Sequence, residues 1–318
     1  MTERGYLRAG IAAIGALGLA SAATAGTGHQ WGDYRWDTNG ATGENALHLN
    51  FSYNFADEAT WLKYYINGTT GSLNGSLRKW DNDLTGKYKS PLSFTDNGKA
   101  THTTSLACDH LNGQVVVCAD DYGTSEGWVG IAEIDAVGIS IIWATARFND
   151  AYFSPSSIYA SVYNNDAQRQ FVACHEIGHT FGLGHLDTSF YNPNKGSCMD
   201  YTADPDGGGR KNPDNRNPGD VDWQVLLSTT MYGDGTATDG GKGNKGNGGG
   251  GRPNRLDPLQ FREVGNPSPQ GSANGRFGLI VGYDGEGRPN EYVRYPGNGH
   301  ERRIFVTWAK GYRPEGSR

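Results

Sequence analysis

Short apolar runs separated by turn residues fill the first half of the chain. Residues 47–51 alternate between apolar and polar side chains, and this period of two is typical of a half-buried strand. Four further runs predict strands: 92–94, 115–117, 128–134 and 139–148. The region from 59 to about 83 favours helix, with Asn-Gly pairs interrupting it. The last strand run is dense in β-branched and aromatic residues, which suit a pleated sheet.

Helical patterns follow the strands. A helix is expected over 166–181, with Phe171, Val172 and Ile177 on its buried face. Another is expected over 220–231, with Asp220 as its N-cap. Strands first and helices later predict an α+β domain with a mixed, twisted sheet, and residues 26–238 suffice for one core.

The composition changes abruptly after this domain. The linker, 239–253, begins with a run that is almost entirely Gly with Lys and Asn, so we expect a flexible tether. Residues 254–318 regain short apolar runs between Gly, Pro and Asn, which predicts a small β-rich segment. This segment is either a small, partly ordered tail or an adhesion module for a polymer or a cell surface.

The first residues indicate export. Arg4 and Arg8 lie just before an apolar run of small residues, and Ala23-Thr24-Ala25 follows as a cleavage site. This pattern predicts a secretory signal peptide over 1–25, because the apolar run is shorter than the ~20 residues that span a bilayer. We therefore expect a secreted, extracellular protein without a membrane span.

The cysteines and the charge fit this compartment. Disulfides are the expected state of cysteines in an oxidising environment. Three pairings are possible: Cys108–Cys118 is the local choice, and it leaves Cys174–Cys198. A thiolate metal ligand is the rival role for the second pair. The formal net charge of −6 argues against nucleic acid as a main partner.

One motif carries the chemistry. Residues 175–185 read H-E-x-x-H-x-x-G-x-x-H. His175 and His179 lie four residues apart and therefore on one helix face, where both can bind one Zn²⁺. Gly182 permits a turn that returns His185 as a third ligand. Three protein ligands leave a position for water, and Glu176 beside it can act as general base.

This motif, together with Met199 in the following turn, resembles that of the metzincin clan of zinc endopeptidases. The resemblance covers about residues 31–233. It implies zinc ligation by the three histidines, Glu176 as base, Gly182 at the turn and Met199 in a Met-turn beneath the metal. Tyr201, two residues after the Met, is similar to the Tyr of astacins and serralysins, which ligates zinc or stabilises the oxyanion. The subfamily stays open.

The resemblance also implies a cleft in which an edge strand binds substrate backbone, and we place that edge at 139–148. Two acidic loops, Asp120-Asp121 and Asp204 to Asp206, offer carboxylates to Ca²⁺, although ordinary solvated turns are the alternative. Cys174 and Cys198 directly precede His175 and Met199, so a bridge between them would join the metal helix to the Met-turn.

The sequence thus predicts a secreted zinc endopeptidase that acts on protein or peptide substrates. Two alternatives remain. The chain could be a non-catalytic, zinc-containing binding protein, or its function could reside in 254–318 with the protease domain as passenger.

Overall fold

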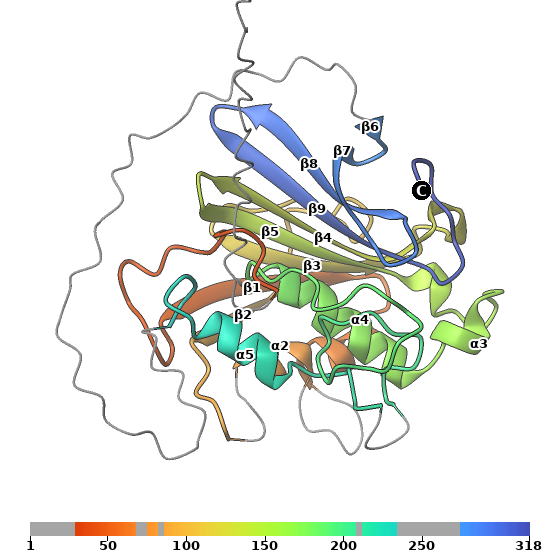
Figure 1. Cartoon of the computed structure of the whole chain (residues 1–318), viewed down its shortest axis with the longest axis horizontal. Helices are drawn as coiled ribbons and strands as arrows, with labels where there is room; N and C mark the ends of the chain where they lie inside the picture. The colour runs from red at the N-terminus through yellow and green to blue at the C-terminus, as the bar shows by residue number, and fades with distance from the viewer. Residues whose placement is uncertain (1–28, 68–74, 82–85, 208–211, 234–273) are drawn as a thin grey trace, which may run out of the picture.

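The strands of the chain join in one sheet. The structure, a computed structural model, describes residues 29–67, 75–81, 86–207, 212–233 and 274–318. Within these residues the sheet has the order β2-β1-β3-β5-β4-β9-β8-β7-β6. The helices α2, α4 and α5 lie together on one face of it (Figure 1). The predicted signal peptide and the Gly-rich linker fall outside the described residues.

The strands are β1 (Leu47–Phe55), β2 (Leu92–Lys99), β3 (Gln114–Asp120), β4 (Trp128–Val137), β5 (Ser140–Asn149), β6 (Asn274–Gly275), β7 (Gly278–Tyr283), β8 (Pro289–Gly297) and β9 (His300–Trp308). The helices are α1 (Glu58–Leu62), α2 (Ser76–Asp81), α3 (Ala160–Tyr163), α4 (Asp166–His179) and α5 (Asp220–Leu226). Single turns of π-helix (Lys63–Asn67) and 3₁₀-helix (Thr124–Glu126, Asp150–Tyr152) complete the set.

The sheet is mixed, which confirms the α+β prediction. β1 pairs in parallel with β2 and with β3, and β3 pairs in parallel with β5. β4 runs antiparallel to β5. The central strand β3 is apolar on both faces: Val115 and Val117 enter the main core, whereas Val116 packs with the Cys108–Cys118 bridge on the other side. A strand covered on both faces reads as a continuous apolar run.

The predicted substrate edge was placed on the wrong strand. The run 139–148 forms β5, which lies between β3 and β4 and has neighbours on both sides. An interior strand has no free backbone groups for strand addition. Strands β1 to β5 lie in the order β2-β1-β3-β5-β4, so β4 is the outer strand on the side of β5, and β9 pairs with it. The sequence pattern identified both β4 and β5, which form an antiparallel pair, but it could not reveal which of them is the outer strand.

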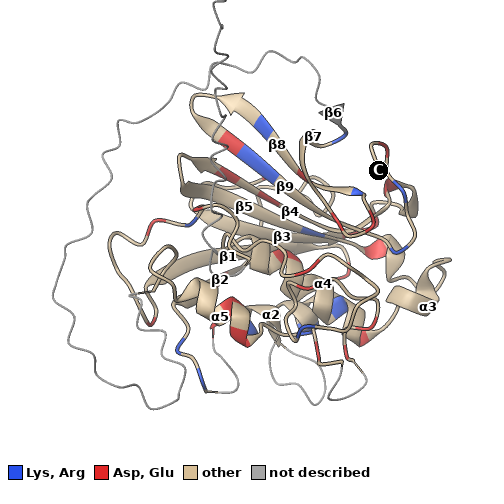
Figure 2. Ribbon diagram, viewed as in Figure 1, with Lys and Arg blue, Asp and Glu red and all other residues tan. Residues whose placement is uncertain are grey.

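The C-terminal strands extend this same sheet, and their β-rich character is confirmed. β9 runs antiparallel to β4 from Trp128↔Trp308 to Val137↔His300. On the outer face, Ile304, Val306 and Trp308 pack against Trp128, Ile131 and Tyr292. Charged residues lie near the start of β9, whereas the half after Arg303 carries none (Figure 2).

The helices begin and end close to the predicted positions, with local corrections. Asn165 caps α4 by accepting from the Gln168 amide at 2.9 Å. Gly219, rather than Asp220, is the N-cap of α5. This helix ends at Leu226 instead of near residue 231. The chain then turns back: the Tyr232 amide donates a hydrogen bond to the Leu226 carbonyl, and the Tyr232 side chain is fully buried.

Both disulfides of the favoured pairing are present. Cys108 bonds to Cys118, and Cys174 bonds to Cys198. The thiolate-ligand alternative is therefore wrong for the second pair. Among the described residues, no helix has the length and apolarity needed to cross a membrane.

Candidate metal centre

The three predicted histidines meet beneath the sheet. His175 and His179 lie one turn apart on α4, fully buried, and their Nε2 atoms are 3.1 Å apart. His185 joins them from the loop after the helix, so that one nitrogen of each ring lies within 4.8 Å of the others. Among the described residues, this is the one group of three or more His, Cys, Asp or Glu side chains placed to hold a metal ion.

Gly182 makes the turn that brings His185 back. Its φ is +91°, a left-handed conformation that glycine adopts without steric cost. A Cβ atom at this position would lie 2.1 Å from the carbonyl oxygen of Tyr34. Two backbone hydrogen bonds hold the same loop: the Trp31 amide donates to the Gly182 carbonyl, and the Gly184 amide donates to the His29 carbonyl. The motif glycine is thus required for both its dihedral angle and its close backbone approach.

We expect Gly182→Ala to lower the free energy of unfolding by more than the about 1–2 kcal/mol that a left-handed alanine costs. The excess comes from the contact with the Tyr34 carbonyl. Gly138→Ala is the matched control, because Gly138 also has positive φ (+62°) but nothing within 4 Å of its added methyl. Urea unfolding of both variants measures the difference. Equal losses would contradict the close approach.

Backbone carbonyls orient two of the rings. The Nδ1–H of His175 donates to the Cys198 carbonyl at 2.6 Å, and that of His179 donates to the Leu183 carbonyl at 2.7 Å. Each Nε2 then carries a lone pair, and two lone pairs this close repel unless a cation lies between them. The Nε2 of His185 is buried without a hydrogen-bond partner. The donor set therefore fits Zn²⁺, which imidazole nitrogens bind at about 2.0–2.1 Å.

Burial favours the neutral, ligating form of these rings. Desolvation, with the charge of neighbouring His185 second, lowers the pKa of His175 and of His179 well below the ordinary histidine value. A neutral imidazole is the form that binds a metal. The low pKa values thus agree with the tautomers that the carbonyl contacts impose.

Glu176 points toward β4. Gly130 of β4 leaves room for it, since a Cβ there would lie 2.3 Å from the Glu176 Oε1. The carboxylate is fully buried, and burial raises its pKa to about 8, although the hydrogen bond from Thr307 opposes this. Thr307 donates to Oε1 at 2.6 Å, whereas Oε2 has no partner. A buried carboxyl group beside convergent imidazoles is suited to proton transfer.

The turn that contains Met199 packs against α4. The Met199 sulfur packs so closely under α4 that a Cβ on Gly178 would lie 2.3 Å from it. The Cys174–Cys198 bridge joins α4 to the start of this turn. Cys198 also supplies the carbonyl that orients His175. The turn therefore supports the histidines both covalently and through a hydrogen bond.

Tyr201 lies beside the histidines but bonds elsewhere. Its ring centroid is 4.8 Å from that of His185. Its buried hydroxyl donates to the Val306 carbonyl and accepts from the Asn290 amide, each at 3.3 Å. In this arrangement the hydroxyl is held by β8 and β9.

Four residues from the C-terminal strands touch the centre and were not predicted from the sequence: Asn290, Glu291, Phe305 and Thr307. They lie more than 100 residues beyond the motif and form no recognisable metal-binding spacing. The apolar run at 304–308 contributed to the predicted β-rich segment, but it did not identify a partner strand. The signal that was missed is the pairing of β9 with β4.

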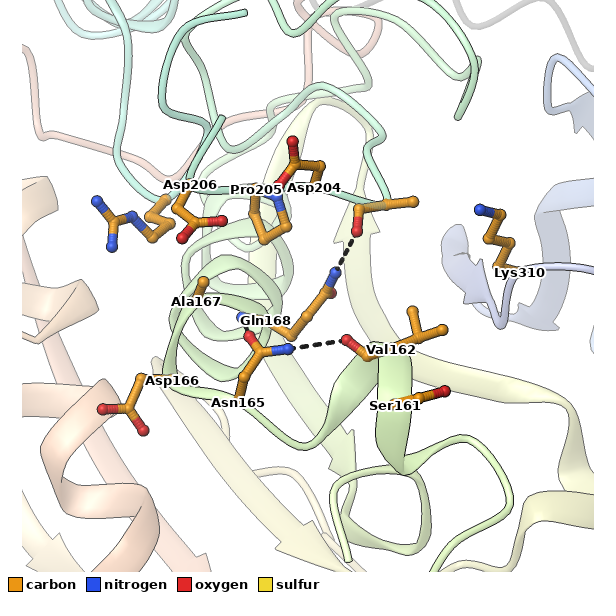
Figure 3. A pocket seen from close by; sticks show the side chains of 12 residues that line it. Ser161, Val162, Asn165, Asp166, Ala167, Gln168, Asp204, Pro205, Asp206 and Lys310 are labelled. Atoms are coloured by element: carbon orange, nitrogen blue, oxygen red, sulfur yellow. Dashed lines mark hydrogen bonds between the residues drawn. The ribbon is translucent and has the colours of Figure 1, made fainter. Parts of the chain in front are cut away.

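The acidic loops do not add a second cluster. Within the described chain, neither Asp120-Asp121 nor Asp204 to Asp206 forms a group of three possible metal ligands, and the calcium hypothesis stays a prediction. Asp204 and Asp206 instead line a pocket of about 500 Å³ at the start of α4, with Asp166 and Lys310 (Figure 3). His175 is nine residues further along the helix, roughly 13 Å away.

Comparison with known proteins gives no relative for this chain. No family model, no curated protein and no solved structure matches it. The functional interpretation therefore depends on the sequence motif and on the geometry of the centre.

Proposed function

We propose that the protein is a secreted zinc endopeptidase of the metzincin type. The observation that carries this proposal is the convergence of His175, His179 and His185 next to the buried carboxylate of Glu176. The two disulfides suit the oxidising surroundings of an exported protein. No nucleic acid or membrane span is part of the proposal.

The residues divide the chemistry between them. Zinc, when bound, polarises the peptide carbonyl and lowers the pKa of water to about 7. Glu176 takes the proton of the attacking water and later returns it to the leaving amine. The substrate backbone adds to the edge of β4 beside Glu176, which β9 occupies in this structure, once β9 has moved away. Tyr201 supplies a hydroxyl for the developing oxyanion once its present partners have moved away.

Casein or gelatin cleavage tests the proposal. Because β9 covers the centre, both the intact chain and a chain cut between residues 239 and 251 are assayed. We expect about one zinc per chain by elemental analysis, and we expect cleavage that a chelator stops and added Zn²⁺ restores. A chain that holds zinc but cleaves nothing in either form would be a non-catalytic binding protein. Absence of bound zinc would overturn both interpretations.

A further inference from the structure

The hairpin formed by β8 and β9, here called the C-terminal hairpin, lies directly over the metal centre. The ring of Phe305 stacks on the His179 imidazole, with centroids 4.1 Å apart and planes 5° from parallel. Thr307, two residues later on the same face, donates to Glu176. A single strand thus contacts both a metal-binding residue and the proposed base.

The other strand of the hairpin reaches the remaining groups. The Glu291 carboxylate lies 3.5 Å from the Nδ1 of His185. The Asn290 amide donates to the Tyr201 hydroxyl, which itself donates to the Val306 carbonyl. The hairpin therefore contacts the Tyr201 hydroxyl and the His185 ring, which a substrate would otherwise meet.

β9 also uses the backbone edge that a substrate needs. It runs antiparallel to β4, with Thr307 opposite Gly130 and Phe305 opposite Ala132. β5 fills the other side of β4. A peptide that binds by strand addition must form the same ladder bonds in the same place. β9 and a substrate thus exclude each other.

The result is a closed centre. His175, Glu176 and His179 have no exposed surface, and the His185 side chain is only 3% exposed. A peptide carbonyl cannot approach the three histidines without displacing Phe305. In this structure the three histidines are therefore closed to a protein substrate.

The two halves of β9 have different contacts: the first half is bound to β4 by ion pairs, and the second half covers the metal centre. Near its start, Arg302 pairs with Glu133 at 3.3 Å and with Asp135 at 3.4 Å, both on β4. The guanidinium of Arg303 lies over the Trp31 ring. The uncharged second half supplies Phe305 and Thr307 to the centre. The ion pairs of Arg302 fix the register of β9 on β4, while the side chains of Phe305 and Thr307 fill the space over the metal centre.

We propose that the C-terminal hairpin is an internal inhibitor that occupies the cleft in the manner of a substrate. This inference rests on the proposed function, because it concerns access to the same centre. Since hairpin and centre belong to one chain, docking is intramolecular, and a covalent link typically supplies an effective concentration on the order of millimolar. Cutting that link and diluting the protein should favour release.

The test places a recognition site for a sequence-specific protease within 239–251 of the otherwise intact, zinc-loaded chain. Two readouts are followed before and after cutting and dilution to micromolar concentration. One is binding of a fluorescent peptide hydroxamate, which needs an open metal centre but no turnover. The other is hydrolysis of a quenched peptide. If one molecule in a hundred is open before cutting, both should rise by about 100-fold at full release.

Added C-terminal fragment should reverse this gain in a concentration-dependent way. A chain that binds hydroxamate fully before cutting would overturn the proposal. So would a chain that unfolds when the fragment leaves, as followed by circular dichroism, because the hairpin would then be an integral part of the fold. A scrambled recognition site controls for the insertion and the added protease.

Variants of the uncut chain test the contacts themselves. Phe305→Ala combined with Thr307→Val removes the ring over His179 and the bond to Glu176, and it should raise hydroxamate binding. Val281→Ala, in an exposed position of β7, is the matched control. If the fragment stays bound after cutting and the double variant binds hydroxamate no better than wild type, the hairpin does not limit access.

A cross-link separates opening from cutting. Val137 and His300 are strand partners on β4 and β9, at a spacing that a disulfide can bridge. The variant Val137→Cys/His300→Cys, cut in the linker but oxidised, should gain neither readout. Hydroxamate binding that rises on cutting without any hydrolysis would support the inhibitor and contradict the protease. Equal hydrolysis by the uncut, the cut and the cross-linked protein would support the protease and contradict the inhibitor.

Discussion

Replacing Glu176 with Gln should leave zinc bound and lower kcat of the opened protein by about 10²–10⁴-fold, the usual contribution of a positioned acid or base. The amide has nearly the shape of the carboxylate, so the space that Gly130 leaves for it stays filled. It cannot accept the proton of the attacking water. The imidazoles and their carbonyl partners are untouched by the change.

Elemental analysis and single-turnover hydrolysis of a quenched peptide measure this outcome. Glu44→Gln, the same chemical change at an exposed position in the part of the chain that keeps the centre after cutting, is the control and should keep wild-type kcat. Normal turnover by Glu176→Gln would mean that another group takes the proton. Loss of zinc from this variant would show that the carboxylate serves the metal centre rather than the proton transfer.

The features that sequence predicted well are local. The spacing of His175, His179 and His185 determines their convergence, because a helix turn and one glycine are enough to place them. The strand runs were found for a similar reason, since alternation and β-branched residues report on neighbouring positions of the same segment. The disulfide pairing followed from the short separation between Cys108 and Cys118.

What could not be predicted is long-range pairing. The residues of β4 and β5 do not tell which of the two strands is the outer one of their pair, or that β4 then meets β9 from the C-terminal segment. Phe305 has the pattern of an ordinary strand residue, yet it stacks on His179. The tertiary partner of a strand depends on the competition between all available edges. For this reason the coverage of the centre became visible only in the structure.

Removing either disulfide should destabilise the zinc-free protein to a similar extent. The bridges span separations of 10 and 24 residues, and loop entropy depends only on the logarithm of this length. We expect Cys108→Ala/Cys118→Ala and Cys174→Ala/Cys198→Ala each to lower the free energy of unfolding by about 3 kcal/mol. Urea unfolding in the presence of a chelator measures both values.

Zinc affinity should separate the two pairs, because only the second bridge holds the centre. Cys198 gives its carbonyl to His175, and Cys174 precedes that histidine on α4. Loss of such an outer partner typically weakens metal binding by about 10–100-fold. Competition with a chromophoric chelator should therefore show weaker zinc binding for Cys174→Ala/Cys198→Ala alone. Equal affinities in both variants would mean that the Met-turn keeps its carbonyl in place without the covalent bond, and that the bridge contributes stability only.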